Sequence, residues 1–370
     1  MKYVDEFRDP VLARRLIAEI RQEVAGHPEI RPVRLMEFCG GHTHAIFRFG
    51  LRQMLAGDVE MHSGPGCPVC VTAALELDTA IAMANLPNVI LTTFGDMVRV
   101  PGSQGTLQEI RAGGADVRIV YSPLDALAIA RDNPKREVIF LGVGFETTAP
   151  GIAAALVQAE QEATPNFSVL SMHKLTPPAM RAILDAGEVS LDGIIGPGHV
   201  SAVIGSDAWQ FLPEHYGIPC AVAGFEPLDL LRAIAALVHA IADKTPGVFN
   251  TYGRSVRPEG NPVAQQMLNR VFEVATTPWR GFGDMTESGL RIRGSFAHRD
   301  AALRFPVKVE EVGEPPGCRC GEVLRAVIDP TECALFQRVC TPRNPLGPCM
   351  VSAEGACAAY YKYGEMESNQ

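Results

Sequence analysis

The cysteines of this chain fall into two groups whose spacing indicates two kinds of sulfur chemistry. The 370 residues include ten cysteines, and six of them lie in the last sixth of the chain. Four thiolates that meet at one point can hold an iron–sulfur cluster or a structural zinc ion. A C-x12-C-x6-C-x16-C spacing relates four of the six: Cys320, Cys333, Cys340 and Cys357. These gaps are too long for the paired knuckles of a zinc ribbon, so the spacing favours an iron–sulfur cluster.

Three further cysteines have less defined roles. Cys318 can replace Cys320 as the first ligand, because only one thiolate of a Cys-Arg-Cys sequence normally reaches a given cluster. Cys349 is interpreted as a spare cysteine that is not needed as a cluster ligand. Cys220 lies inside the apolar run IPCAVAG and is expected to be a packed core thiol.

A second type of sulfur chemistry is indicated by Cys67 and Cys70 in the segment SGPGCPVC. This C-x-x-C pair follows a glycine turn and precedes an expected helix, so Cys70 would lie where the helix dipole stabilises a thiolate. Redox-active dithiols are built in this way. Half of a zinc site and a simply packed pair remain as alternatives.

Cys39 opens the sequence Cys-Gly-Gly-His-Thr-His at the end of an expected strand. The glycines let the backbone approach closely, and His42 can reach the same concavity as the thiol. A thiolate and an imidazole together suit iron, zinc or copper. A cysteine–histidine nucleophile and a purely structural role are the alternatives.

The order of elements predicts an α/β fold with parallel sheets. Short apolar runs end in Gly/Pro turns and alternate with helical stretches, as in β-α units. Strands are expected at 34–38, 88–94, 116–121, 137–143, 167–172, 192–196 and 218–224. Helices are expected at about 5–25, 72–85, 150–163 and 228–243. Polar residues after these strands are further candidate ligands: Asp96, Arg99, Glu146, Thr147, Thr148, His173, Lys174, His199 and Glu226.

The predicted organisation is an N-terminal helix at 1–30, two similar α/β domains at 31–115 and 116–245, and an irregular C-terminal domain at 246–370 that holds the cluster. Two Gly-Pro-Gly turns, in HSGPGCPV and IIGPGHVS, suggest that the two α/β domains have a similar build. Strand-like runs become rare after about residue 245, where Pro and Gly increase.

The composition excludes several classes of protein. Hydrophobic residues make up 47% and charged residues 20%, which predicts a globular chain. A net charge of −9 without a basic stripe argues against nucleic acid as a partner. No apolar run is long enough for a membrane span, and the N-terminus lacks a secretory h-region, so we expect a cytoplasmic protein.

The ordered motifs CGGHTHAI, GPGCPVC, TFGDMVRVPG, GFETTAP, PGHVS, GFEP, CRCGEVLR and CMVSAEGACAAYY resemble the HypD family of hydrogenase maturation proteins. The resemblance covers about residues 30–365. It implies a C-terminal [4Fe–4S] cluster and a scaffold role in assembling the Fe(CN)2CO unit of [NiFe]-hydrogenases. It also implies two partners: HypC, a small chaperone that shares the iron, and HypE, which donates cyanide.

The resemblance assigns roles to residues of this chain. It implies that Cys39 holds the iron with His42 nearby, and that Cys67 and Cys70 form the catalytic redox pair. Glu354 would place a carboxylate near this site. The cluster ligands would be Cys320, Cys333, Cys340 and Cys357. The rival hypothesis is a disulfide reductase similar to ferredoxin–thioredoxin reductases, which needs no iron at Cys39.

Overall fold

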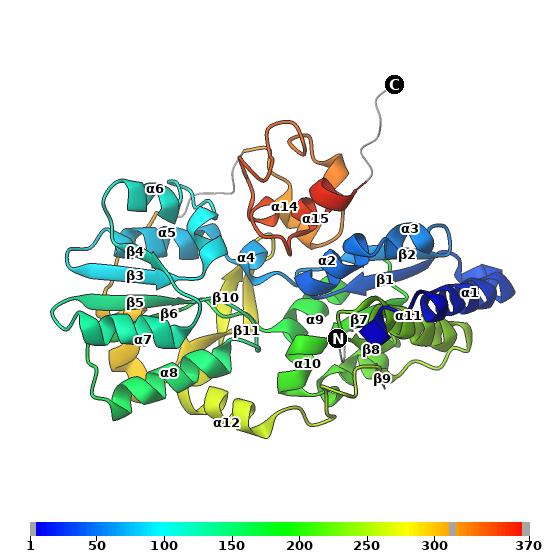
Figure 1. The fold of residues 1–370 in the computed structure, drawn as a ribbon, viewed down its shortest axis with the longest axis horizontal. Helices are drawn as coiled ribbons and strands as arrows, with labels where there is room; N and C mark the ends of the chain where they lie inside the picture. The colour runs from blue at the N-terminus through cyan, green and yellow to red at the C-terminus, as the bar shows by residue number, and fades with distance from the viewer. Residues whose placement is uncertain (1–4, 311–315, 365–370) are drawn as a thin grey trace.

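Two parallel sheets and a cysteine-rich C-terminal segment make up the computed structural model, which describes residues 5–310 and 316–364 (Figure 1). The first sheet has the order β2-β1-β7-β8-β9 and the second β4-β3-β5-β6. All neighbouring strands in both sheets are parallel. The sequence-based prediction of an α/β fold with parallel sheets is confirmed.

The first sheet consists of β1 (Val33–Glu37), β2 (Val59–Ser63), β7 (Gly193–Pro197), β8 (Cys220–Ala223) and β9 (Val248–Asn250). Its helices are α1 (Pro10–Gly26), α2 (Gly40–Arg48), α3 (Leu51–Met54), α10 (Gly198–Ile204) and α11 (Pro227–Ala242). Helix α1 begins where the Asp9 side chain accepts hydrogen bonds from the N–H groups of Val11 and Leu12. Its apolar face packs on α11 and closes one face of this sheet.

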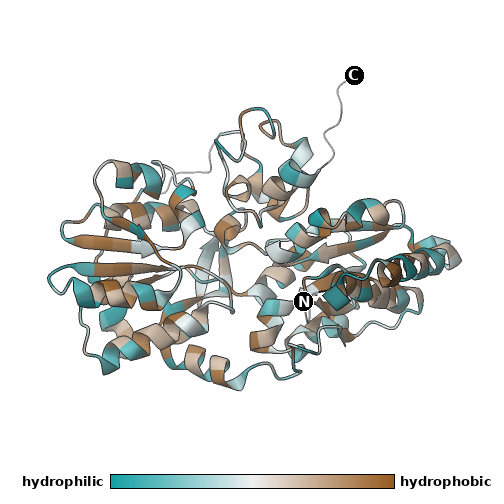
Figure 2. Ribbon diagram, in the orientation of Figure 1, coloured by the Kyte–Doolittle hydropathy of each residue, from teal (hydrophilic) through white to brown (hydrophobic). Residues whose placement is uncertain are grey.

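The second sheet consists of β3 (Val89–Thr93), β4 (Val117–Ile119), β5 (Glu137–Gly142) and β6 (Phe167–Ser171). Its helices are α5 (Ala74–Ala84), α6 (Leu107–Ala112), α7 (Pro123–Asp132) and α8 (Ala149–Gln161). Helix α9 (Thr176–Ala186) packs instead in the core of the first sheet, with Met36 and Ile194. Helices α7 and α8 cover one face, and α5 and α6 cover the other. Strands β3 and β5 are therefore buried on both faces, as their continuous apolar sequences predict (Figure 2).

Further helices, turns and strands lie outside the two sheets. They are α4 (Pro68–Val71), α12 (Pro262–Val271), β10 (Phe272–Trp279), β11 (Gly283–Ile292), α13 (Ala301–Arg304), α14 (Cys320–Leu324), the 3-10 turn η8 (Pro348–Met350) and α15 (Ala356–Tyr363). Strands β10 and β11 form an antiparallel hairpin between the sheets, and the C-terminal segment lies over the junction beside α4. This hairpin was not expected from the sequence.

The sheets divide the chain differently from the predicted domain boundaries. Strands β1 and β2 lie in one sheet with β7, β8 and β9, although Ser63 and Gly193 are 130 positions apart in the sequence. The boundary expected at 115/116 falls between β3 and β4, which are paired neighbours. Both Gly-Pro-Gly turns follow strands of the first sheet, β2 and β7, so they do not mark equivalent positions in two domains. Sequence-local patterns do not reveal such an interleaved topology.

Candidate metal and redox centre

Cys39 lies at the carboxyl end of β1, where it is the N-cap residue of α2. Its backbone N–H donates a 2.8 Å hydrogen bond to Oε2 of Glu37, and the Thr43 hydroxyl donates to Oε1 of the same carboxyl group. The Glu37 side chain is buried, and burial raises its pKa to about 7. One buried carboxyl therefore fixes the turn that presents the thiol.

The loop that carries the C-x-x-C pair packs directly against Cys39. The Gly40 N–H donates a 3.1 Å hydrogen bond to the Gly66 carbonyl. A Cβ on Gly66 would overlap the backbone of Cys39, so only glycine permits this approach. Since Gly66 immediately precedes Cys67, the contact places both cysteine motifs at the same edge of the first sheet.

Cys39 is a free, partly buried cysteine. Burial, together with the charges of Glu354 and Glu37, raises its pKa to about 12. The backbone N–H groups of Gly41 and His42 oppose this effect only partly. The free site therefore favours a neutral thiol, and a bound cation is what would stabilise the thiolate.

The His42 imidazole is fully buried, and its contacts are made at the end of β8. Nε2 lies 3.2 Å from the Ala223 carbonyl oxygen, and the ring stacks on Phe225 at a centroid distance of 4.7 Å. A carbonyl only accepts hydrogen bonds, so Nε2 carries the proton and Nδ1 keeps a lone pair. Nδ1 has no hydrogen-bond partner in the described part of the chain, and burial lowers the His42 pKa to about 4. Metal-binding histidines are commonly held in this way.

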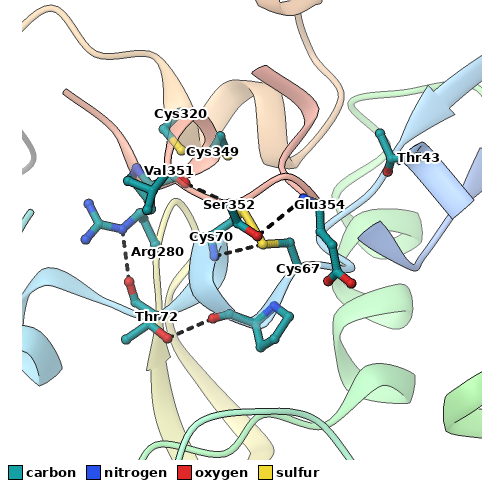
Figure 3. Close-up of a disulfide and its surroundings, with 12 residues drawn as sticks. Thr43, Cys67, Cys70, Thr72, Arg280, Cys320, Cys349, Val351, Ser352 and Glu354 are labelled. Carbon is teal, nitrogen blue, oxygen red and sulfur yellow. Dashed lines mark hydrogen bonds between the residues drawn. A yellow bond between two sulfur atoms is a disulfide. The ribbon is translucent and has the colours of Figure 1, made fainter. Parts of the chain in front are cut away.

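Cys67 and Cys70 form a disulfide with a Cα–Cα distance of 5.2 Å. Cys67 is the N-cap of α4, and its sulfur accepts a 3.2 Å hydrogen bond from the Cys70 N–H. Both residues are buried, with 3% and 0% of their surfaces exposed. Cys70 Sγ lies 3.9 Å from the Pro348 carbonyl oxygen, so the pair faces the C-terminal segment (Figure 3). A disulfide is the oxidised state of a redox pair, and while it is formed neither sulfur can act as a thiolate ligand to zinc.

One cavity is lined by Leu335, Phe336, Met350 and all six C-terminal cysteines. These are Cys318, Cys320, Cys333, Cys340, Cys349 and Cys357. The sulfurs of Cys320 and Cys349 are 3.0 Å apart. The neighbouring Cys318 and Cys349 thiols lower the pKa of Cys320, because their hydrogen bonds stabilise a thiolate there. Cys349, which was interpreted as a spare, is therefore half of a close pair. Its 29-residue separation from Cys320 left no local sign of this contact.

The described residues contain no group of three or more His, Cys, Asp or Glu side chains that could hold a single metal ion. A multi-iron cluster is a different case, because each iron takes its own thiolate and the ligand sulfurs stand farther apart. A cavity lined by six cysteines fits such a cluster in donor type and number. At Cys39 the protein offers one thiol and the nearby His42, which is too few ligands for a closed metal site.

A single short segment, 348–354, passes all three sulfur groups. Its first residue, Pro348, contacts Cys70, and Cys349 faces Cys320. The Val351 carbonyl accepts a 3.0 Å hydrogen bond from Arg99. Its last residue, Glu354, lies against Gly40, where any added Cβ would strike its backbone and side chain. The fold thus brings the C-terminal cysteines, the disulfide and Cys39 together, and Figure 3 shows the central part of this arrangement.

Thr147, singled out in the sequence, is exposed, and the other eight polar candidates divide into two sets. Arg99 contacts the site, His199 stacks on Phe225 at 3.9 Å, and Asp96 is close enough for its charge to act on Glu354. The second set makes contacts within the fold: Glu146 with Thr176, Thr148 with Val143 and Phe145, His173 with Ser171, Lys174 with Glu76, and Glu226 with Arg8.

No helix in the described ranges has the length and apolar character needed to cross a membrane. The family model described as "HypD: Hydrogenase formation hypA family" matches residues 11–364. The chain is 50% identical to the hydrogenase maturation factor HypD of Azotobacter vinelandii, over 98% of this chain and 97% of that protein. It is 45% identical to HypD of Escherichia coli K12 over the full length of both. It is 47% identical to HypD2 of Bradyrhizobium diazoefficiens, over 100% and 99% of the two chains. The chain therefore belongs to the HypD family.

Proposed function

We propose that this chain is a hydrogenase maturation factor, and that it acts as a scaffold on which the Fe(CN)2CO unit of [NiFe]-hydrogenases is assembled. Its family membership supports the general role, since its relatives carry the name hydrogenase maturation factor. The observation that carries the scaffold role is the contiguity of Cys39, the buried disulfide and the C-terminal cysteines.

Iron is the substrate held at Cys39, with His42 as a second ligand. The free lone pair on Nδ1 of His42 supports this role, as does a Cys39 thiol that ionises readily only with a cation present. Two protein ligands leave positions open for cyanide, carbon monoxide and a ligand from a partner. Family resemblance suggests that HypC supplies that ligand and that HypE delivers cyanide.

The C-terminal cavity holds a [4Fe–4S] cluster, whose contribution when bound is to supply electrons singly at low potential. The sequence leaves open whether Cys318 or Cys320 is the first ligand. The geometry of the cavity supports Cys318. Cys320 is already engaged with Cys349 at 3.0 Å, a separation suited to a dithiol rather than to two cluster thiolates. The ligand set is then Cys318, Cys333, Cys340 and Cys357, all of which line the cavity.

Cys320 and Cys349 line this cavity and belong to the same buried cluster as Cys67 and Cys70. A thiolate of the reduced C-terminal pair attacks one sulfur of the Cys67–Cys70 bond and forms a mixed disulfide. The second C-terminal thiol then resolves it. The products are a Cys320–Cys349 disulfide and reduced Cys67 and Cys70, so two electrons move and no external oxidant is needed. The reduced dithiol stores two electrons next to the iron at Cys39.

The test is replacement of Cys39 by alanine in protein purified together with HypC. We expect loss of bound iron and of the infrared bands of metal-bound cyanide and carbon monoxide, with the visible absorption of the cluster retained. Cys220→Ala is the matched control, because Cys220 is a buried cysteine in β8. Unchanged iron and infrared bands in the Cys39 variant would refute the scaffold proposal.

A free-standing disulfide reductase is less well supported. Such an enzyme must present its dithiol to a protein substrate, whereas Cys67 and Cys70 are 3% and 0% exposed. Their sulfurs face the protein's own C-terminal segment instead.

A further inference from the structure

The turn between β10 and β11, residues 279–283, contacts the chain segments that follow Cys70 and Cys320. On one side it binds the end of α4. The Arg280 N–H donates a 2.9 Å hydrogen bond to the Val71 carbonyl, and Arg280 Nε donates one of the same length to the Thr72 carbonyl. Arg280 is only 1% exposed. Since Val71 and Thr72 directly follow Cys70, the turn holds the residues next to the disulfide.

On its other side the same turn contacts the C-terminal segment. The backbone of Gly281 packs on Gly321, which directly follows Cys320, and the Arg325 guanidinium donates to the Gly281 carbonyl. A Cβ on Gly321 would stand 2.8 Å from the Gly281 Cα, whereas ordinary van der Waals contacts begin at 3.4 Å. An added methyl group would therefore push the two backbones apart by about 0.6 Å, the difference between these two distances. The two glycines set the minimum distance between the turn and the segment that carries Cys320.

We propose that the 279–283 turn is a positioning element that holds the Cys320/Cys349 pair at exchange distance from the Cys67–Cys70 disulfide. This inference rests on the exchange step of the proposed function. Thiol–disulfide exchange requires the attacking sulfur to approach in line with the bond it breaks, so its rate is sensitive to small displacements. A misplacement of about 1 Å in a reacting group can slow a reaction by about 100-fold. The Gly281–Gly321 contact fixes this alignment through the backbone.

The experiment measures the effective concentration of two thiols, one from each pair, in the full-length chain. Cys67→Ser and Cys320→Ser together leave Cys70 and Cys349 as single partners. Oxidised glutathione then forms a Cys70–Cys349 disulfide with release of two reduced glutathione molecules. Mass spectrometry of alkylated peptides at a series of glutathione ratios gives the effective concentration of the two thiols.

We expect Gly321→Ala to lower this effective concentration by at least tenfold. Gly281→Ala should have a similar effect, but its φ of +82° adds backbone strain. Gly283→Ala is the matched control, since Gly283 lies in the same turn with a φ of +74° and a Cβ added there would meet nothing within 4 Å. The Gly283 variant should have an effective concentration within twofold of that measured with the native turn.

Two outcomes would overturn the inference by different routes. Equal values in the Gly321 and Gly283 variants would refute the positioning role, while leaving the exchange step intact. Failure to form any Cys70–Cys349 disulfide with the native turn would refute the exchange step, and the positioning role with it. Circular dichroism and thermal unfolding of each variant separate either result from a general loss of structure.

Discussion

Glu146 has a buried carboxyl group, and its ionisation should destabilise the fold around the second sheet. It lies in the GFETTAP segment after β5 and is 2% exposed. Its oxygens accept hydrogen bonds from the Thr176 N–H at 2.8 Å and the Thr176 hydroxyl at 2.9 Å. Burial raises the pKa of Glu146 to about 7 from an ordinary value of 4.5, despite these hydrogen bonds. The folded protein therefore favours the neutral acid.

The sign of the effect follows from proton binding in the two states. Between pH 4.5 and 7 the unfolded chain has released this proton while the folded chain keeps it, so stability falls as pH rises. The difference between a pKa of about 7 in the folded chain and 4.5 in the unfolded chain lowers the free energy of unfolding by about 3 kcal/mol at pH values above 7, relative to pH values below 4.5. Integrated between pH 5 and pH 8, the loss from this group is about 2.5 kcal/mol.

Glu146→Gln removes this pH dependence and keeps the shape of the side chain. The amide can accept from the Thr176 N–H and donate to the Thr176 hydroxyl, so both hydrogen bonds are retained. We expect the variant to be more stable than the native protein at pH 8, with an advantage about 2.5 kcal/mol larger than at pH 5. Urea unfolding of both proteins at the two pH values measures this difference.

Asp116→Asn provides a control beside the same sheet. Hydrogen bonds from Arg118 and Arg136 lower the pKa of this carboxyl from 3.8 to about 2. Both partners stay charged between pH 5 and 8, so the variant should show a constant difference over this range. A Glu146→Gln difference that is also constant over this range would refute the reasoning.

Three further predictions concern the sulfur groups and one buried cation. The pKa of Cys39 is raised from an ordinary 9.0 to about 12, so at pH 8 the folded protein holds roughly 1000-fold less Cys39 thiolate than the unfolded chain. Iodoacetamide should therefore label Cys39 far more slowly in folded than in urea-unfolded protein. Equal labelling rates would contradict the raised pKa. Cys333→Ser should abolish the visible absorption of the cluster and Cys349→Ser should retain it, whereas the opposite pattern would exclude the proposed ligand set. Arg299 is 3% exposed and donates to the Ala159 and Phe167 carbonyls at 3.1 Å. Arg299→Met should lower the free energy of unfolding by about 3–5 kcal/mol, because it strands buried acceptors; a loss below about 1 kcal/mol would contradict this.

The sequence by itself determined the local structure and the chemical character of the site. Seven apolar runs predicted seven of the parallel strands to within about two residues, because a strand buried on both faces needs a continuous apolar sequence. It missed β2, in which His62 and Glu60 interrupt the apolar pattern, and the three-residue strand β9. It also missed the hairpin, whose half-exposed strands alternate with polar residues. Cysteine spacing and the glycine-rich turns identified the candidate sulfur centres, since these depend on residue type and short separations.

Only the tertiary structure decided which distant segments meet. The pairing of β1 with β7, the contact of Cys320 with Cys349 and the packing of Gly281 on Gly321 join residues that are 29 or more positions apart. Such contacts depend on the packing of whole layers, and no local periodicity records them. The same holds for the carboxyl groups, because burial that raises the pKa of Glu146 is a property of its neighbours in space.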